Sequence, residues 1–196
     1  MNDSAVLWIE NNFYIIFLNN VLKNMYEYFL VKKNKIFFSL NIFLYFFLFS
    51  ILNSNTILRI MSIIDIVALH FPSNVENEFE FLYVNLNYSL NLRSFLKILI
   101  KKEDLMISIS NLYNSTAWLE REIWDLFGIK FIYHKDLRRI LTDYGFLGHP
   151  LLKQFPLIGF IELRYDDSIL NILKEAVEMS QMYRFFRFMN PWVIWR

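Results

Sequence analysis

The chain has 196 residues, is 56% hydrophobic and 19% aromatic, and carries a formal net charge of +1. This balanced charge argues against nucleic-acid binding, because long-range attraction to phosphate groups would be weak. The absence of cysteine excludes disulfides, a thiol nucleophile and an iron–sulfur cluster held by thiolates of this chain.

The N-terminal part of the chain predicts a helix followed by a hairpin. Residues 12–24 have the spacing of an amphipathic helix, and residues 26–40 predict two strands around a lysine-rich turn at 32–35. The terminus carries Asp3 and Glu10 and lacks the basic segment and apolar run of a secretory signal. We therefore expect no such signal in this sequence.

An uncharged run at residues 36–52 leaves two interpretations open. The run reaches the lower length limit of a membrane-spanning helix, with lysine before it and Arg59 after it. Ser39 and Asn41 favour the other interpretation. In that case a short strand precedes a buried helix over residues 42–52, and Asn41 is the N-cap of this helix.

A pair of antiparallel strands is expected in the middle of the chain. It follows residues 57–71, which have mixed helix and strand character, and a polar turn at 72–78. Residues 79–88 alternate as a strand, and residues 94–100 are the expected partner. One face of the first strand should carry Phe79, Phe81, Tyr83 and Asn85.

Together these elements predict an α+β fold. We expect a single domain with a mixed or antiparallel sheet packed by helices, followed by an extended irregular C-terminal tail. The expected division is an N-terminal helical segment at residues 1–25, a core domain at 26–150 and the tail at 151–196.

A second helix should start between Ser108 and Ser115 and end at Gly128, because glycine readily adopts the left-handed conformation that ends many helices. At 100° per residue its apolar stripe contains Leu112, Leu119, Ile123 and Leu126. The opposite side carries Trp118, Arg121, Glu122 and Asp125. Arg121 and Asp125 can pair at i, i+4, and this pattern alone favours a core helix with a solvated charged face.

The residues after this helix mix charges, aromatic rings and glycine too densely for a simple amphipathic element. Charged groups among so many rings are costly to bury unless they are paired, so the acids should have bidentate arginine partners. The acids are Glu120, Glu122, Asp125 and Asp136, and the bases are Arg121, Arg138 and Arg139. Such a network can lie inside the domain or across an interface.

Metal and catalytic patterns in this segment are incomplete. His134 and His149 with Glu122 or Asp125 could ligate a metal in principle, but no HExxH, cysteine or EF-hand spacing supports this. A histidine that hydrogen-bonds in a turn is favoured instead.

Catalysis by paired carboxylates is also disfavoured. Glu120 and Glu122 would point about 200° apart on a helix, so they form no acid/base pair. Asp143 has His149 nearby in sequence but no nucleophile in a recognisable turn. The glycine pair at 145 and 148 is too closely spaced to cradle a phosphate chain.

Several blocks in a fixed order carry a resemblance to a known family. They are EREIWDLFGIKF at 120–131, DLRRILTDYGFLGHP at 136–150, KQFP at 153–156 and ELRYDD at 162–167. They resemble the 30-kilodalton-subunit family of respiratory complex I, which includes mitochondrial NADH dehydrogenase subunit nine and its bacterial equivalent. The chain departs from the family pattern at Lys135, Leu152 and Gln154.

The resemblance implies a non-catalytic core subunit in the quinone module of proton-pumping NADH:ubiquinone oxidoreductase. Its partners would be the other subunits of the complex, chiefly the quinone-site subunit and neighbouring iron–sulfur subunits. It implies no cofactor in this chain, with FMN, iron–sulfur clusters and quinone held by partner subunits. It also favours the soluble interpretation of residues 36–52, and membrane association would be indirect.

The resemblance further implies that the charged motif is a docking surface and that the tail at 151–196 contacts partner subunits. The motif comprises Glu120, Arg121, Glu122, Asp125, Gly128, His134, Asp136, Arg138, Arg139, Asp143, Gly145, Gly148, His149 and Pro150. The composition, typical of an AT-rich genome, and the absence of an arginine-rich presequence suggest a mitochondrial gene. The expected location is the matrix side of the mitochondrial inner membrane. The alternative is a small membrane-anchored protein or an energy-converting-hydrogenase-type subunit that shares the motif.

Overall fold

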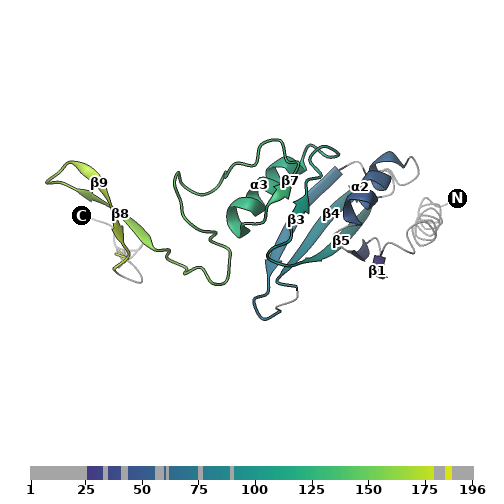
Figure 1. The fold of residues 1–196 in the computed structure, drawn as a ribbon, viewed down its shortest axis with the longest axis horizontal. Coiled ribbons are helices and arrows are strands. Elements are labelled where there is room, and N and C mark those ends of the chain that lie inside the picture. The colour runs from purple at the N-terminus through teal and green to yellow at the C-terminus, as the bar shows by residue number, and fades with distance from the viewer. Residues whose placement is uncertain are drawn as a thin grey trace, which may run out of the picture. The chain divides into compact units, whose positions relative to one another are not determined.

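The computed structural model describes residues 26–32, 35–40, 44–55, 60, 62–74, 77–88, 91–178 and 184–186. The predicted helix at 12–24 lies outside these residues. The chain divides into two compact units, with the boundary between Lys153 and Gln154. Figure 1 shows the elements of both units.

The first unit contains a five-stranded mixed sheet. Its strands are β1 (Tyr26–Lys32), β2 (Lys35–Leu40), β3 (Ser62–His70), β4 (Phe79–Asn87) and β5 (Leu92–Ile100). They are ordered β1-β2-β5-β4-β3, and β2 pairs with β5 in parallel while the other pairs are antiparallel. The predicted hairpin at 26–40 and the predicted pairing of the two middle strands are therefore confirmed.

The alternation predicted for β4 is also confirmed. Phe79, Phe81, Tyr83 and Asn85 are buried, and the residues between them are partly exposed. Because successive side chains of a strand point to opposite faces, one face of the sheet is mainly apolar. Its buried polar residues are Asn85 and Ser94, which are opposite each other on β4 and β5, Asn87 on β4 and His70 at the end of β3.

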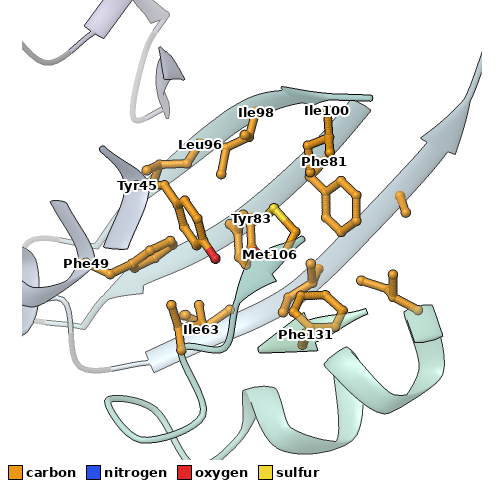
Figure 2. Close-up of a cluster of buried hydrophobic side chains, with 14 of the residues drawn as sticks. Tyr45, Phe49, Ile63, Phe81, Tyr83, Leu96, Ile98, Ile100, Met106 and Phe131 are labelled. Atoms are coloured by element: carbon orange, nitrogen blue, oxygen red, sulfur yellow. The ribbon is translucent and has the colours of Figure 1, made fainter. Parts of the chain in front are cut away.

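Helix α2 (Tyr45–Ser54) covers this face at one end of the sheet. Tyr45, Leu48, Phe49 and Leu52 are buried, and their i, i+3, i+4, i+7 spacing matches one side of a helix. The ring centroid of Phe49 lies 5.1 Å from that of Tyr83 on β4. Figure 2 shows these rings pointing into a common core.

The uncharged run at 36–52 is thus divided between β2 and α2, and among the residues that the structure describes no helix has the length and apolarity to cross a membrane. The helix begins at Tyr45, and Leu44 takes the N-cap position without a side-chain cap bond. The predicted cap Asn41 and the predicted start at residue 42 lie outside the described residues.

Helix α3 (Thr116–Phe127) packs on the same face of the sheet, with the ring of Phe127 6.4 Å from that of Phe79. Two short strands flank it, β6 (Met106–Ile107) and β7 (Phe131–Ile132), and they pair in parallel. Met106 and Phe131 are both buried in the core, so the chain is tied to the core immediately before and after α3. The segment after β7 therefore begins at a strand that is anchored in the core.

In the second unit, the described residues form an antiparallel hairpin of β8 (Ile161–Asp166) and β9 (Asn171–Ala176). Arg164 on β8 pairs with Glu175 on β9 at 2.9 Å. The periodicity of the sequence did not reveal this hairpin within the predicted tail.

Candidate functional site

The C-terminus of α3 is the starting point of the site. Gly128 has φ +80° and its N–H donates to the Trp124 carbonyl at 3.0 Å, so it ends the helix as predicted. A side chain at this position would meet the ring of His149, because a Cβ would lie 2.6 Å from its Cδ2 atom. His149 Nδ1 in turn donates to the carbonyl of Asp125 at 2.9 Å. The glycine therefore supplies both the turn and the space for this ring.

Asp125 is the centre of the site. Its side chain is fully buried, and its Oδ2 atom accepts hydrogen bonds from the backbone N–H groups of Ile140, Leu141 and Thr142 at 3.1, 2.7 and 2.9 Å. Its Oδ1 atom accepts from the Thr142 hydroxyl at 2.7 Å and from Arg139 Nε at 2.7 Å. One carboxylate on a helix thus holds three consecutive backbone amides of a segment that lies more than a dozen residues further along the chain.

These bonds decide the charge of Asp125. Burial alone raises the pKa of its carboxyl, but the hydrogen bonds from Thr142, Leu141 and Arg139 together outweigh burial and hold the pKa well below its usual range. The ionised form accepts all five bonds. Asp125 is therefore a structural anion.

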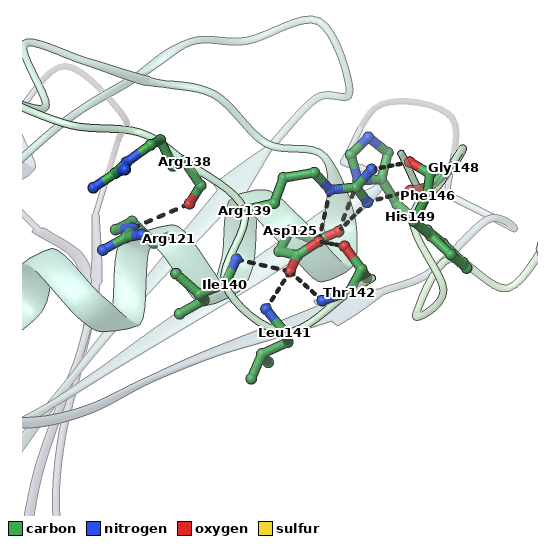
Figure 3. Close-up of polar contacts among 10 residues, drawn as sticks. All are labelled: Arg121, Asp125, Arg138, Arg139, Ile140, Leu141, Thr142, Phe146, Gly148 and His149. Carbon is green, nitrogen blue, oxygen red and sulfur yellow. Dashed lines mark hydrogen bonds and ion pairs between the residues drawn. The ribbon is translucent and has the colours of Figure 1, made fainter. Parts of the chain in front are cut away.

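Arg139 closes the same network. Its guanidinium donates to the carbonyl of Phe146 at 2.6 Å, to the carbonyl of Asp125 at 3.1 Å and to the carbonyl of Gly148. Its charge also lies 5.6 Å from the centre of the Phe146 ring. Figure 3 shows Arg139 between the end of α3 and the far side of the loop. The loop from Ile140 to His149 is consequently fixed to the helix at both of its ends.

The outer part of this loop is exposed. Asp143 accepts a bond from the Tyr144 N–H at 2.8 Å, and Gly145 and Gly148 have φ of +72° and +101°. The Tyr144 side chain is 97% exposed. After Pro150 the chain returns to the helix, where the Leu151 N–H donates to the Leu126 carbonyl at 3.0 Å.

Glu120 forms a second buried carboxyl site, one that no arginine enters. It accepts from the Ser108 hydroxyl and, at 2.9 Å, from the Ile109 N–H. Burial raises the pKa of Glu120 to about 7, although the bonds from Ser108 and Ile109 oppose this rise. His134 Nε2 lies 3.8 Å from it. This carboxyl ties the segment before α3 to the helix.

His134 supports the first turn of α3 in the manner expected of a histidine in a turn. Its Nδ1 atom accepts from the Asp136 N–H at 3.1 Å, so the ring proton of the neutral form is on Nε2, which lies 3.1 Å from the Ala117 carbonyl. Asp136 itself pairs with Arg138 at 2.7 Å on the surface. No three His, Cys, Asp or Glu side chains in the described part of the chain lie close enough together to hold a metal ion.

Three sequence predictions about α3 are wrong. Asp125 does not pair with Arg121, and it lies in the interior instead of on a solvated face. Arg121 donates to the Arg138 carbonyl at 3.1 Å and stacks on Trp118. Arg139 occupies the place beside the Asp125 carboxylate, and its guanidinium also donates to three backbone carbonyls. Glu120 likewise has hydroxyl and amide partners in place of an arginine, and Glu122 is exposed.

One polar group that sequence reasoning missed lies at the end of β3. His70 is 4% exposed, its Nε2 atom is 2.8 Å from Glu78 Oε1, and its Nδ1 atom accepts from the Lys153 N–H at 3.0 Å. This histidine fixes the last residue of the first unit to the sheet. The only sequence signal is that His70 falls on the buried side of the β3 alternation, with Ile66 and Ala68.

Comparisons with known proteins agree with this arrangement. The family model described as respiratory-chain NADH dehydrogenase, 30 Kd subunit, matches residues 46–160. The NADH-ubiquinone oxidoreductase subunit 9 of Prototheca wickerhamii is 49% identical over 129 residues, which cover 66% of this chain and 67% of the relative. The protein of the same name from Acanthamoeba castellanii is 42% identical over 188 residues and covers 92% of each chain.

A solved structure shows a similar fold. A chain in the structure of the membrane-bound sulfane sulfur reductase, an archaeal respiratory membrane complex, aligns with a TM-score of 0.55 and 23% identity. The alignment covers 65% of this chain and 76% of that chain. From the family match and the two relatives, this chain belongs to the 30-kilodalton-subunit family of respiratory-chain NADH dehydrogenase and is a subunit of NADH:ubiquinone oxidoreductase, complex I.

Proposed function

We propose that this subunit is a structural and assembly component of the quinone module in the matrix arm of complex I. In this role it docks on the quinone-site subunit and supports electron transfer from NADH to ubiquinone without reacting itself. The observation that carries the proposal is the Asp125 network. In this network a buried carboxylate and an arginine hold a loop in place. The outer residues of this loop, such as Tyr144 and Leu147, are 97% and 77% exposed.

A rigid loop with exposed large side chains suits docking, because little conformational freedom is lost when a partner covers it. The charged residues of the motif divide accordingly. Asp125, Glu120 and Arg139 act inside the domain, and Glu122, Arg138 and Asp143 are on its surface. The motif proposed from the sequence is therefore partly a scaffold and partly the surface that the scaffold presents.

Electron transfer through this chain would need a redox centre, and the absence of cysteine leaves no thiolate to hold an iron–sulfur cluster. We propose that the iron–sulfur clusters are held by partner subunits, and that FMN and quinone are bound there too, as membership of the family suggests. Neighbouring iron–sulfur subunits are the natural further contacts. The location that follows is the matrix side of the mitochondrial inner membrane, with the membrane reached only through partners.

The tail at 151–196 is proposed to contact partner subunits as well. Its hairpin exposes Ile161, Leu163, Tyr165 and Ile172, each more than half exposed, on one face. A two-stranded hairpin is marginally stable by itself in water. Burial of this apolar face against another subunit would stabilise it.

Affinity isolation of the tagged chain in mild detergent tests the proposal. The quinone-site subunit and NADH dehydrogenase activity are expected to copurify with it. In the same material, Arg139→Ala should reduce the amount of assembled complex while turnover per assembled complex stays normal. The control is Lys102→Ala, which removes an exposed positive charge outside the motif and should leave assembly unchanged. Normal assembly with lost turnover for Arg139→Ala would contradict a purely structural role.

A further inference from the structure

A small pocket of about 160 Å³ opens beside the first two turns of α3. Trp118 and Arg121 of the helix line one side, and His134, Lys135 and Asp136 line the other. It is smaller than the pockets of roughly 300 Å³ or more that hold cofactors and other small molecules. Its size suits a single side chain.

The floor of this pocket is already complete. His134 has only 3% of its side chain exposed, and its two ring nitrogens contact the Asp136 N–H and the Ala117 carbonyl. Ser110, also at the floor, has its hydroxyl 2.7 Å from that of Ser108. The ring nitrogens of His134 and the Ser110 hydroxyl therefore already have partners inside the domain.

The rim carries two positive charges, Arg121 and Lys135. Arg121 uses Nε for the Arg138 carbonyl, and of the residues that the structure describes none offers a carboxylate to Arg121 or Lys135 at ion-pair distance. The carboxylate on the rim, Asp136, is bound to Arg138 at 2.7 Å. Glu120 lies beneath His134 and faces Ser108 and Ile109. The pocket thus attracts an anion from outside the domain.

Trp118 adds an apolar wall. Its side chain is 64% exposed, and the Arg121 guanidinium lies 4.8 Å from its ring centre. Stacking holds the guanidinium in place and leaves its terminal N–H groups available for bidentate bonds to a carboxylate. Tryptophan and arginine are also the side chains most enriched at the energetic centres of protein interfaces.

We propose that this pocket receives an aspartate or glutamate side chain of a neighbouring complex I subunit. The carboxylate lies between Arg121 and Lys135, and the aliphatic stem packs on Trp118. This inference rests on the docking function proposed above and identifies the chemistry of one contact. The positive charges of Arg121 and Lys135 favour a carboxylate, and the pocket volume of about 160 Å³ is suited to a single side chain.

Carbodiimide crosslinking of the intact complex tests the inference, because this reagent joins an ammonium directly to a carboxylate in contact with it. Mass spectrometry is expected to find Lys135 joined to an aspartate or glutamate of another subunit. The matched control is Lys135→Arg, which keeps the charge but forms no such product, so that crosslink should disappear while assembly persists. Products that join Lys135 only to its own chain, or no Lys135 product beside abundant products of other lysines, overturn the inference.

A charge swap gives an independent readout. Arg121→Glu should lower the amount of assembled complex about tenfold or more, and an arginine at the crosslinked acid of the partner should restore it. Glu103→Arg reverses a charge at an exposed position outside the motif and should change assembly less than about twofold. Failure of the partner substitution to restore Arg121→Glu overturns the inference. If the chain does not copurify with the complex at all, the docking function itself fails.

Discussion

The sheet core and the loop at 140–149 are both ordered, but by opposite means. The core is held by apolar side chains such as Phe81 and Phe49, which are completely buried. The loop contributes few buried side chains, and its backbone is held by Asp125, Arg139 and His149. The difference shows that one charged residue in a helix can order a surface loop and leave loop side chains such as Tyr144 and Leu147 exposed.

The core and the loop also differ in the substitutions that they tolerate. Apolar burial is non-directional, so the core tolerates changes that conserve volume. The loop depends on an ionised carboxylate with five donors, and removing a partner of a buried charge leaves groups that have lost contact with water. Substitutions in the core are therefore limited by side-chain volume, and substitutions in the loop are limited by charge and hydrogen-bond geometry.

The largest expected effect is in the core. Phe81→Ala should lower the free energy of unfolding by about 3–5 kcal/mol, because the ring is fully buried between the sheet and the helices. Urea unfolding of the purified protein measures this loss. Leu82→Ala, on the other face of the same strand and partly exposed, is the control and should cost much less. Equal losses would mean that the two faces of the sheet are equally buried.

Asp125→Asn is expected to cost about 2–4 kcal/mol and to act first on the loop, since it removes the charge that Arg139 and three amides face. Trypsin cleavage after Arg138 or Arg139 should become faster before the sheet unfolds. Asp143→Asn is the control, because this carboxylate is exposed and its effect should stay within about 0.5 kcal/mol. Cooperative unfolding of the whole unit with no local cleavage would show that loop and core are one region.

The two buried carboxyls are expected to respond to pH in opposite directions. Burial raises the pKa of Glu120 from 4.5 to about 7, so the folded protein keeps a proton that the unfolded chain releases within this window. Protonated Glu120 therefore contributes to the free energy of unfolding fully below pH 4.5, and this contribution is lost as the pH rises through about 7. The loss is at most about 3 kcal/mol. The pKa of Asp125 is lowered in the folded protein, so ionised Asp125 contributes fully to the free energy of unfolding above pH 3.8. This contribution is lost as the pH falls further.

Unfolding measured near pH 5 and near pH 8 separates these effects. Glu120→Gln should remove the part of the pH dependence that Glu120 causes, and Asp125 is ionised in both folded and unfolded chains over that interval. An unchanged slope in Glu120→Gln would show that Glu120 is ionised in the folded state.

The smallest expected effect separates backbone strain from side-chain contact. Gly145→Ala should cost about 1 kcal/mol, because φ is +72° but nothing lies within 4 Å of the new methyl group. Gly128→Ala meets the His149 ring as well and should cost about 2 kcal/mol, with the bond between His149 and the Asp125 carbonyl weakened. Equal losses in thermal unfolding would indicate that the His149 ring moves aside freely.

The sequence by itself determined the elements whose residues signal them locally. Alternation located β4 and its buried face, and Gly128 marked the end of α3, because these patterns depend on neighbours a few residues apart. The charged motif also stood out by composition, and its blocks were specific enough to indicate the family.

Only the tertiary structure decided which charges meet. The i, i+4 spacing predicted that Asp125 pairs with Arg121. In the fold, the Asp125 carboxylate instead binds Arg139 and the backbone amides of residues 140–142, which are 14 to 17 residues further along the chain. The bond between His70 and Lys153 spans 83 residues and leaves no local trace. Periodicity describes one element at a time, whereas the partner of a buried polar group is chosen by the packing of several elements, and that choice exists only in the folded chain.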